Sequence, residues 1–280
     1  MNARSWAFRL LELYGTQIRH RGHWWTHLQL RKLLRADIDE DLEVVRNGLK
    51  WVLNPSDFTQ AEFFWTGSWE GWDTYHLRRM LAPGSTFFDV GANFGYYSIT
   101  LAAALSPECH GHAFEPFPTT YRRLRRNIEL NCLQDVVDAH HIALLDVKGT
   151  GYMKTTPGNS GAARVDNDRR GEAITTTTLD AFCEGQTVPR IDLVKLDVEG
   201  SEERVLLGGA DVISTFKPLL MVELNPGVLA RTGSSPEILI NRLRSLGYDL
   251  FVAARDALVP LGALPVGPTD YVNVLCTPRG

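Results

Sequence analysis

From Gly84 onward, short apolar runs alternate with segments of helical periodicity, and this alternation limits the fold more than any other feature of the sequence. We expect the runs to be strands and the segments between them to be helices. Alternating strands and helices form a mainly parallel sheet with helices on both faces. The sequence therefore predicts a doubly wound α/β domain with seven strands, at Thr86–Val90, His112–Phe114, Val136–Ile142, Leu193–Leu196, Leu219–Glu223, Asp249–Ala253 and Tyr271–Cys276.

The first 80 residues follow a different pattern. Apolar residues recur at helical spacing up to about residue 40, and Asn47-Gly48 separates the extended runs Leu42–Arg46 and Leu49–Leu53. An Asn-Gly pair between two such runs predicts a β-hairpin, because both turn residues need positive φ. We expect residues 1–80 to form a helical and hairpin cap, and residues 81–280 to form the α/β domain. The polar stretch Thr155–Arg170 is expected to be a long loop.

Composition excludes several classes of protein. A net charge of −4 without a clustered basic face argues against a nucleic-acid partner. The sequence has neither a signal-peptide pattern nor a run of about 20 apolar residues, and its four cysteines have no metal-ligand or disulfide spacing. We expect a cytoplasmic protein without a membrane span, with the N-terminal helices as the candidate surface for a homo-oligomer.

A glycine turn follows the first strand of the α/β pattern. Gly91 and Gly95 flank Ala92, Asn93 and Phe94, and a helical segment with Tyr97 and Ser98 comes next. Glycine lets the backbone approach a ligand closely, and the carboxyl ends of parallel strands are the usual ligand site of such sheets. The turn is therefore the first candidate binding site.

Two carboxylates indicate the kind of ligand. The spacing Gly-x-x-x-Gly differs from the Gly-x-Gly-x-x-Gly of dinucleotide sites, and Asp89 suits the ammonium of an amino acid better than a pyrophosphate. Glu115 ends the next predicted strand, where a carboxylate can accept hydrogen bonds from two ribose hydroxyls. An amino-acid end, a ribose and an adenine together describe S-adenosylmethionine.

Four segments of the chain resemble the FkbM family of methyltransferases. They are Asp89–Gly95, Phe114–Pro116, Ile191–Glu202 and Pro218–Leu224. The third, an Ile-Asp-x-x-Lys-x-Asp-x-Glu-Gly run, is the most specific of them. The resemblance implies a class I Rossmann-like fold and methyl transfer from S-adenosylmethionine, usually to a hydroxyl of a sugar, polyketide or other secondary metabolite. The cofactor contacts that follow are expected from Glu70, Asp89, Gly91, Ala92, Asn93, Gly95, Tyr97, Ser98, Glu115, Pro116, Ala143 and Asp197.

Three acids are candidates for the catalytic end of the site. Asp197 and Glu199 follow one predicted strand and Glu223 ends the next. An alcohol is a weak nucleophile, so these carboxylates can serve as a general base, or Asp197 and Glu223 can hold a divalent ion such as Mg²⁺. The plainer interpretation places Glu199 and Glu202 in the first turn of a helix. Lys195 either forms a salt bridge or takes part in the site.

The acceptor is the least defined part of the prediction. Trp69 and Glu70 resemble a Tyr-Glu element of the family, and Asn159 and Ser160 lie in the expected long loop, so Trp69, Asn159 and Ser160 are candidate substrate contacts. We expect a small-molecule or glycan hydroxyl as acceptor. An N-methyltransferase, an NAD-dependent oxidoreductase and a non-catalytic ligand-binding protein are the alternatives.

Overall fold

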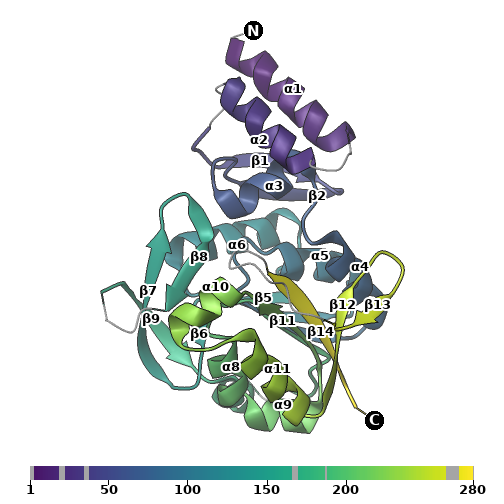
Figure 1. The fold of residues 1–280 in the computed structure, drawn as a ribbon, viewed down its shortest axis with the longest axis vertical. Coiled ribbons are helices and arrows are strands. Elements are labelled where there is room, and N and C mark those ends of the chain that lie inside the picture. Colours follow the sequence, from purple (N-terminus) through teal and green to yellow (C-terminus); the bar gives the residue numbers. More distant parts are fainter. Residues whose placement is uncertain are drawn as a thin grey trace. The chain divides into compact units, whose positions relative to one another are not determined.

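The computed structural model describes residues 3–18, 23–34, 38–165, 170–186, 188–262 and 271–279 (Figure 1). The chain divides into two compact units, Met1–Gly71 with Thr156–Gly161, and Trp72–Thr155 with Ala162–Gly280. The helix α4 (Gly71–Met80) thus lies almost wholly in the second unit, although the sequence pattern assigns it to the cap. None of the helices in the described ranges is long and apolar enough to span a bilayer.

The described residues of the first unit form three helices and the predicted hairpin. Its helices are α1 (Ala3–Gln17), α2 (His23–Leu33) and α3 (Phe58–Thr66). The strands β1 (Leu42–Arg46) and β2 (Leu49–Leu53) pair antiparallel from Leu42↔Leu53 to Arg46↔Leu49. Asn47 and Gly48 take φ values of 54° and 79°, so the left-handed Asn-Gly turn is confirmed.

An aromatic core holds the first unit together. Trp51, Phe63, Phe64 and Trp65 are fully buried, with ring centroids 5.0 Å apart between Trp51 and Phe63. Burying such rings removes the largest apolar areas in the chain from water. The outer face of α1 keeps Trp6, Leu10 and Leu13 exposed, and a homo-oligomer through this face stays a prediction.

The second unit is built on an eight-stranded sheet. The strand order is β13-β12-β14-β11-β10-β3-β4-β5. The parallel part contains β3 (Thr86–Val90), β4 (His110–Phe114), β5 (Val137–His140), β10 (Leu193–Leu196) and β11 (Leu219–Leu224). The antiparallel neighbours are β12 (Tyr248–Ala253), β13 (Leu258–Pro260) and β14 (Val272–Pro278).

All seven predicted strands are therefore present, and β14 runs antiparallel between β11 and β12. The count of seven is wrong by one, because the edge strand β13 pairs with β12. Three residues that end in a proline give no strand periodicity, so only pairing defines β13.

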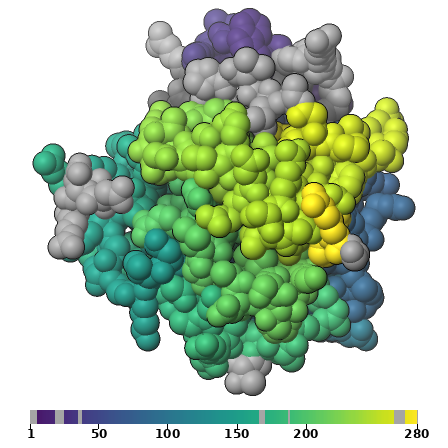
Figure 2. Space-filling view, turned by 60° about the horizontal axis from the view of Figure 1, so that its bottom comes forward, coloured from purple at the N-terminus to yellow at the C-terminus, as the bar shows by residue number. Residues whose placement is uncertain are grey.

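Helices cover both faces of this sheet (Figure 1). Helices α5 (Tyr96–Leu105) and α6 (Pro118–Leu130) lie on one side. The other side carries α7 (Leu179–Gln186), α8 (Glu202–Gly208), α9 (Ala210–Phe216) and α11 (Pro236–Ser245), whose side chains share one core with Phe88, Val194 and Val222. The segment from α10 (Pro226–Leu229) and the 3₁₀ turn η1 (Ala230–Thr232) to β13 is continuous on one surface, in yellow-green to yellow (Figure 2). The doubly wound α/β architecture is confirmed.

A second, four-stranded sheet replaces the expected long loop. Its order is β6-β9-β7-β8, from β6 (Ala143–Leu144), β7 (Gly149–Thr156), β8 (Asn159–Val165) and β9 (Glu172–Thr177). The prediction of a structureless Thr155–Arg170 is wrong as far as Val165, and residues 166–169 lie outside the described part. The β8 sequence, Asn-Ser-Gly-Ala-Ala-Arg-Val, has no alternation of apolar and polar residues, so no pattern in the sequence reveals this strand.

Candidate cofactor and catalytic site

The glycine turn stands at the carboxyl end of the central strand β3. Gly91 and Ala92 donate backbone hydrogen bonds to the Phe114 carbonyl at 3.0 and 2.9 Å, and α5 begins directly after Gly95. Gly91 has a φ of 79°, and a Cβ atom there would lie 1.9 Å from the Asp197 carbonyl oxygen. The turn therefore packs backbone against backbone with the loop that follows β10, and only glycine allows this approach.

Asp89 is anchored inside the protein. The residue is 1% exposed, and Oδ2 accepts hydrogen bonds from the Ser98 amide at 3.0 Å and the Ser98 hydroxyl at 2.6 Å. The other oxygen, Oδ1, lies 3.2 Å from Lys195 Nζ. Asp89 and Ser98 thus join strand β3 to the first turn of α5. Direct contact of either residue with a cofactor stays a prediction.

Lys195 is the cation at the centre of the site. It is 4% exposed, and its Nζ lies 3.2 Å from Asp89 Oδ1 and 3.3 Å from Asp197 Oδ2. The same ammonium donates to the Gly91 carbonyl at 3.1 Å and lies 5.2 Å from the centre of the Tyr97 ring. A buried charge needs such partners to offset its loss of hydration. Of the two roles expected for Lys195, the structure shows the salt bridge, and places it at the glycine turn.

Glu115 follows β4 and lies beside the turn. Its Oε2 accepts from the Asn93 amide at 3.0 Å and its Oε1 accepts from the Phe117 amide at 2.9 Å. Burial raises the pKa of Glu115 to about 7, although these two amides oppose the shift. Each carboxylate oxygen has a second lone pair. The carboxyl group is therefore held in a defined orientation and can still bind hydroxyl donors such as a ribose diol.

The loop after β10 gathers three carboxyl groups. Glu199 has a φ of 52° and Gly200 a φ of 95°, so the chain turns sharply between Asp197 and α8. Burial first, and then the Asp197 and Glu202 carboxylates, raise the pKa of Glu199 to about 8, although Arg164 and Arg231 oppose the shift. A carboxyl group with this pKa exchanges its proton near neutral pH, as a general base must.

Glu202 has a structural role in this loop. Its Oε1 accepts hydrogen bonds from the Val198 and Gly200 amides, both at 3.1 Å, while Oε2 is buried with no hydrogen-bond partner in the described ranges. Burial raises its pKa to about 7. The interpretation of Glu202 as a helix-start residue is confirmed, whereas Glu199 precedes α8 and does not belong to it.

Glu223 lies in β11, the strand next to β10. The register pairs Leu196 with Val222, and Asp197 and Glu223 directly follow these two residues in the chain, so both lie at the same edge of the sheet. Asp197 is already paired with the Lys195 ammonium, and the three-ligand group found among the described residues contains neither acid. An Mg²⁺ ion held by Asp197 and Glu223 stays a prediction.

The remaining predicted residues lie at several places. Pro116 and Ala143 follow the ends of β4 and β5, and Trp69 and Glu70 lie in the first unit between α3 and α4. Asn159 and Ser160 also belong to the first unit, at the tip of the β7–β8 hairpin. The structure thus brings the cofactor candidates of β3, β4 and β10 together. Trp69, Glu70, Asn159 and Ser160 belong to the first unit.

The two hairpin-tip residues bind the start of α3. Asn159 Oδ1 accepts from the Thr59 hydroxyl at 2.9 Å, and the Ser160 amide and hydroxyl donate to the Asp57 carboxylate at 2.7 and 3.0 Å. Asp57 also caps α3 by accepting from the Thr59 and Gln60 amides. These contacts give both residues a structural role, and their contact with a substrate stays a prediction.

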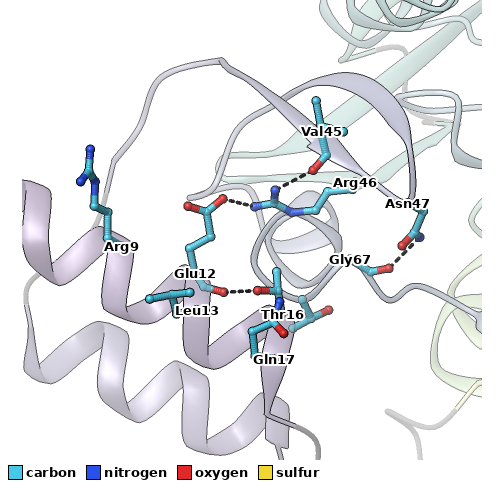
Figure 3. Close-up of a pocket in the computed structure, with 10 residues that line it drawn as sticks. Arg9, Glu12, Leu13, Thr16, Gln17, Val45, Arg46, Asn47 and Gly67 are labelled. Carbon is cyan, nitrogen blue, oxygen red and sulfur yellow. Dashed lines mark hydrogen bonds and ion pairs between the residues drawn. The ribbon is translucent and has the colours of Figure 1, made fainter.

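The first unit contains a cavity of about 580 Å³ that none of the predicted site residues lines. Figure 3 shows the buried Arg46 guanidinium in its wall, between Glu12 Oε1 at 2.9 Å and the Val45 carbonyl at 2.8 Å. Arg46 is thus satisfied by the protein itself. Because the predicted carboxylates gather at the glycine turn and not at this cavity, we place the chemistry at the turn.

The chain is similar to known methyltransferases. The sequence profile of the "Methyltransferase FkbM domain" matches residues 89–250. Methyltransferase sdnD of Sordaria araneosa is 30% identical over 161 residues, covering 45% of this chain and 61% of sdnD. The 31-O-demethyl-FK506 methyltransferase FkbM of Streptomyces tacrolimicus is 31% identical over 164 residues, covering 47% of this chain and 62% of the relative.

One further curated protein and one solved structure are also similar to this chain. The hexuronic acid methyltransferase AglP of Haloferax volcanii is 29% identical over 141 residues, covering 50% of this chain and 56% of AglP. The crystal structure of methyltransferase FkbM from Methylobacillus flagellatus has a TM-score of 0.46 and 15% identity, covering 97% of this chain and 58% of that one. The chain spans roughly three fifths of the length of the curated relatives it matches. Because the FkbM profile spans more than half of the 280 residues and includes the glycine turn, Glu115 and the acidic loop, the chain belongs to the FkbM methyltransferase family.

Proposed function

We propose that this chain transfers the methyl group of S-adenosylmethionine to a hydroxyl of a small molecule or glycan. The observation that carries the proposal is the arrangement of the glycine turn, the anchored Glu115 carboxylate and the acidic loop at the carboxyl ends of β3, β4 and β10. Two relatives support the acceptor class, since one is named for a hexuronic acid and another for the 31-O position of a macrocycle.

The residues fit the cofactor at its two polar ends. Glu115 is held by two amides and has lone pairs left for the ribose hydroxyls. The turn at Gly91 has no side chain, so its backbone can approach the amino-acid end of the cofactor. When bound, S-adenosylmethionine supplies a methyl group on a positively charged sulfur. Lys195 holds the Asp89 and Asp197 carboxylates in place on one side of the turn.

Glu199 is the best candidate for the general base. Its carboxylate is the group that can accept the hydroxyl proton of the acceptor, because its pKa of about 8 keeps it near the working pH. Asp197 is less suited, since its carboxylate is engaged by Lys195. We do not assign Mg²⁺ to Asp197 and Glu223, because the Lys195 ammonium already supplies the positive charge there.

The experiment is methyl transfer from isotopically labelled S-adenosylmethionine to matched hydroxyl and amine acceptors, including hexuronic acid glycosides and polyketide alcohols. We expect label on hydroxyl acceptors, and a Glu199→Gln variant with kcat reduced about 100-fold or more. The matched control is Glu203→Gln, which changes a carboxylate bound to Arg242 and Ser234. Label on amine acceptors alone would contradict O-methylation, and an unchanged Glu199→Gln rate would contradict its role as base.

A further inference from the structure

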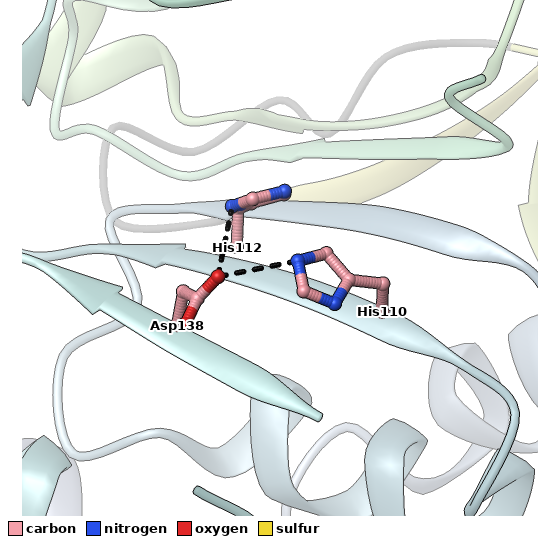
Figure 4. A group of neighbouring side chains, drawn as sticks. All are labelled: His110, His112 and Asp138. Atoms are coloured by element: carbon pink, nitrogen blue, oxygen red, sulfur yellow. Dashed lines mark ion pairs between the residues drawn. The ribbon is translucent and has the colours of Figure 1, made fainter. Parts of the chain in front are cut away.

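Three histidines and an aspartate gather on the two outermost parallel strands of the large sheet. His110 and His112 lie on β4, while Asp138 and His140 lie on the edge strand β5. The register pairs His112 with Asp138 and Phe114 with His140. Because side chains two residues apart in a strand share a face, all four point to the same side of the sheet. Figure 4 shows the Asp138 carboxylate between the rings of His110 and His112.

The ligand atoms of His110, His112 and Asp138 all lie within 4.8 Å of one another, and His140 adjoins them through His112. His110 Nε2 and Asp138 Oδ2 are 3.2 Å apart, and His112 Nδ1 and His140 Nε2 are 3.1 Å apart. His112 Nδ1 lies 4.0 Å from Asp138 Oδ2. Zinc–nitrogen bonds of about 2.0–2.1 Å in a tetrahedron put neighbouring ligand atoms roughly 3.3 Å apart. Small side-chain movements therefore suffice to enclose one ion.

The two inner histidines are held in place by aromatic rings. His140 stacks on Phe114 with ring centroids 4.9 Å apart, and both His112 and His140 contact the Phe182 ring edge to face. A neutral imidazole has one nitrogen with a free lone pair, which is the form that binds metals.

The two outer ligands are open to solvent. The side chains of His110 and Asp138 are 48% and 53% exposed, so an ion has a path to the inner pair. None of these four residues takes part in the cofactor site described above. The ligand set of imidazoles with one carboxylate suits zinc and similar transition metals, whereas magnesium and calcium prefer oxygen ligands.

We propose that His110, His112, His140 and Asp138 bind a divalent transition-metal ion of the zinc class, which cross-links β4 to the edge strand β5. The site stabilises the region that carries Glu115, because the Glu115 amide donates to the His140 carbonyl at 3.0 Å.

The test is calorimetric titration of the tag-free, chelator-stripped full chain with Zn²⁺, supported by the visible absorption of Co²⁺ in the same site. We expect one ion per chain, a higher melting temperature with Zn²⁺, and the absorption of tetrahedral Co²⁺. His110→Gln and Asp138→Asn change exposed side chains, so both variants should fold, and each should weaken Zn²⁺ binding at least tenfold.

His141→Gln is the matched control. His141 is the next residue along the chain and stacks on Tyr121 of α6 with centroids 4.6 Å apart, away from the cluster. It should bind Zn²⁺ as the unmodified chain does. Absence of stoichiometric binding, or equal affinity in His110→Gln and Asp138→Asn, would overturn the proposal and leave a hydrogen-bonded histidine pair. Both results are read without any methyltransferase assay.

Discussion

The close contact between Gly91 and the loop after β10 makes a quantitative prediction about Gly91→Ala. Alanine at a φ of 79° costs roughly 1–2 kcal/mol relative to glycine. Its Cβ would also lie 1.9 Å from the Asp197 carbonyl oxygen and 2.9 Å from the carbonyl carbon. Since both are backbone atoms, β3 and the loop must move apart, which costs roughly a further 1–3 kcal/mol. We expect Gly91→Ala to lower the free energy of unfolding by roughly 2–5 kcal/mol in total.

Gly84→Ala separates the two contributions. Gly84 has the same φ of 79°, but no atom lies within 4 Å of the added Cβ. It should lose only the backbone contribution of roughly 1–2 kcal/mol. Urea unfolding at equilibrium measures both variants, and titration with S-adenosylhomocysteine should show weakened binding in Gly91→Ala alone. Equal losses of stability in the two variants would refute the close-packing argument.

Three other variants test separate parts of the account. Lys195→Met leaves the Asp89 carboxylate buried without its cation and should cost about 3–5 kcal/mol in urea unfolding; a loss below 1 kcal/mol would count against the ion pair. In wild type the rate should rise with pH to an inflection near 8, where Glu199 ionises, and Glu199→Gln should lack this inflection. Between about pH 4.5 and 8 Glu199 is ionised in the unfolded chain but protonated in the folded one, so wild type loses stability as pH rises, by up to about 1.4 kcal/mol per pH unit. Glu199→Gln does not titrate and should therefore gain stability relative to wild type over this range. Asp57→Ala removes the α3 cap and two Ser160 contacts and should lower the free energy of unfolding by about 1–3 kcal/mol. Proteolysis at the β7–β8 hairpin tip should become faster. Unchanged proteolysis would argue against these contacts as the anchor of the tip.

Patterns confined to a few neighbouring residues predicted much of the fold. The Asn47-Gly48 hairpin and the strands around Asp89 and Lys195 were all predictable, because turn chemistry and apolar runs act locally. The glycine turn and Glu115 were also identifiable as a pair, since parallel strands end at the same edge of a sheet.

Features that depend on pairing between distant segments were not predictable in the same way. The β7–β8 hairpin contains few apolar residues and β13 has three residues that end in a proline, so neither gives a periodic signal. The role of Lys195 depends on register with Asp89, although a lysine inside a buried run was itself a signal that an acid lies nearby. His110, His112 and Asp138 converge only because β4 pairs with β5 in one register.

Calorimetric titration with S-adenosylhomocysteine, with NAD as comparison, tests the central claim most directly. We predict one site of about micromolar affinity for S-adenosylhomocysteine and none for NAD. Glu115→Ala should weaken binding at least tenfold, because the ribose hydroxyls lose their acceptor, whereas Glu129→Ala, which removes an exposed carboxylate of α6 paired with Arg125, should not. Binding of NAD alone, or equal affinity of wild type and Glu115→Ala, would contradict the assignment of this site.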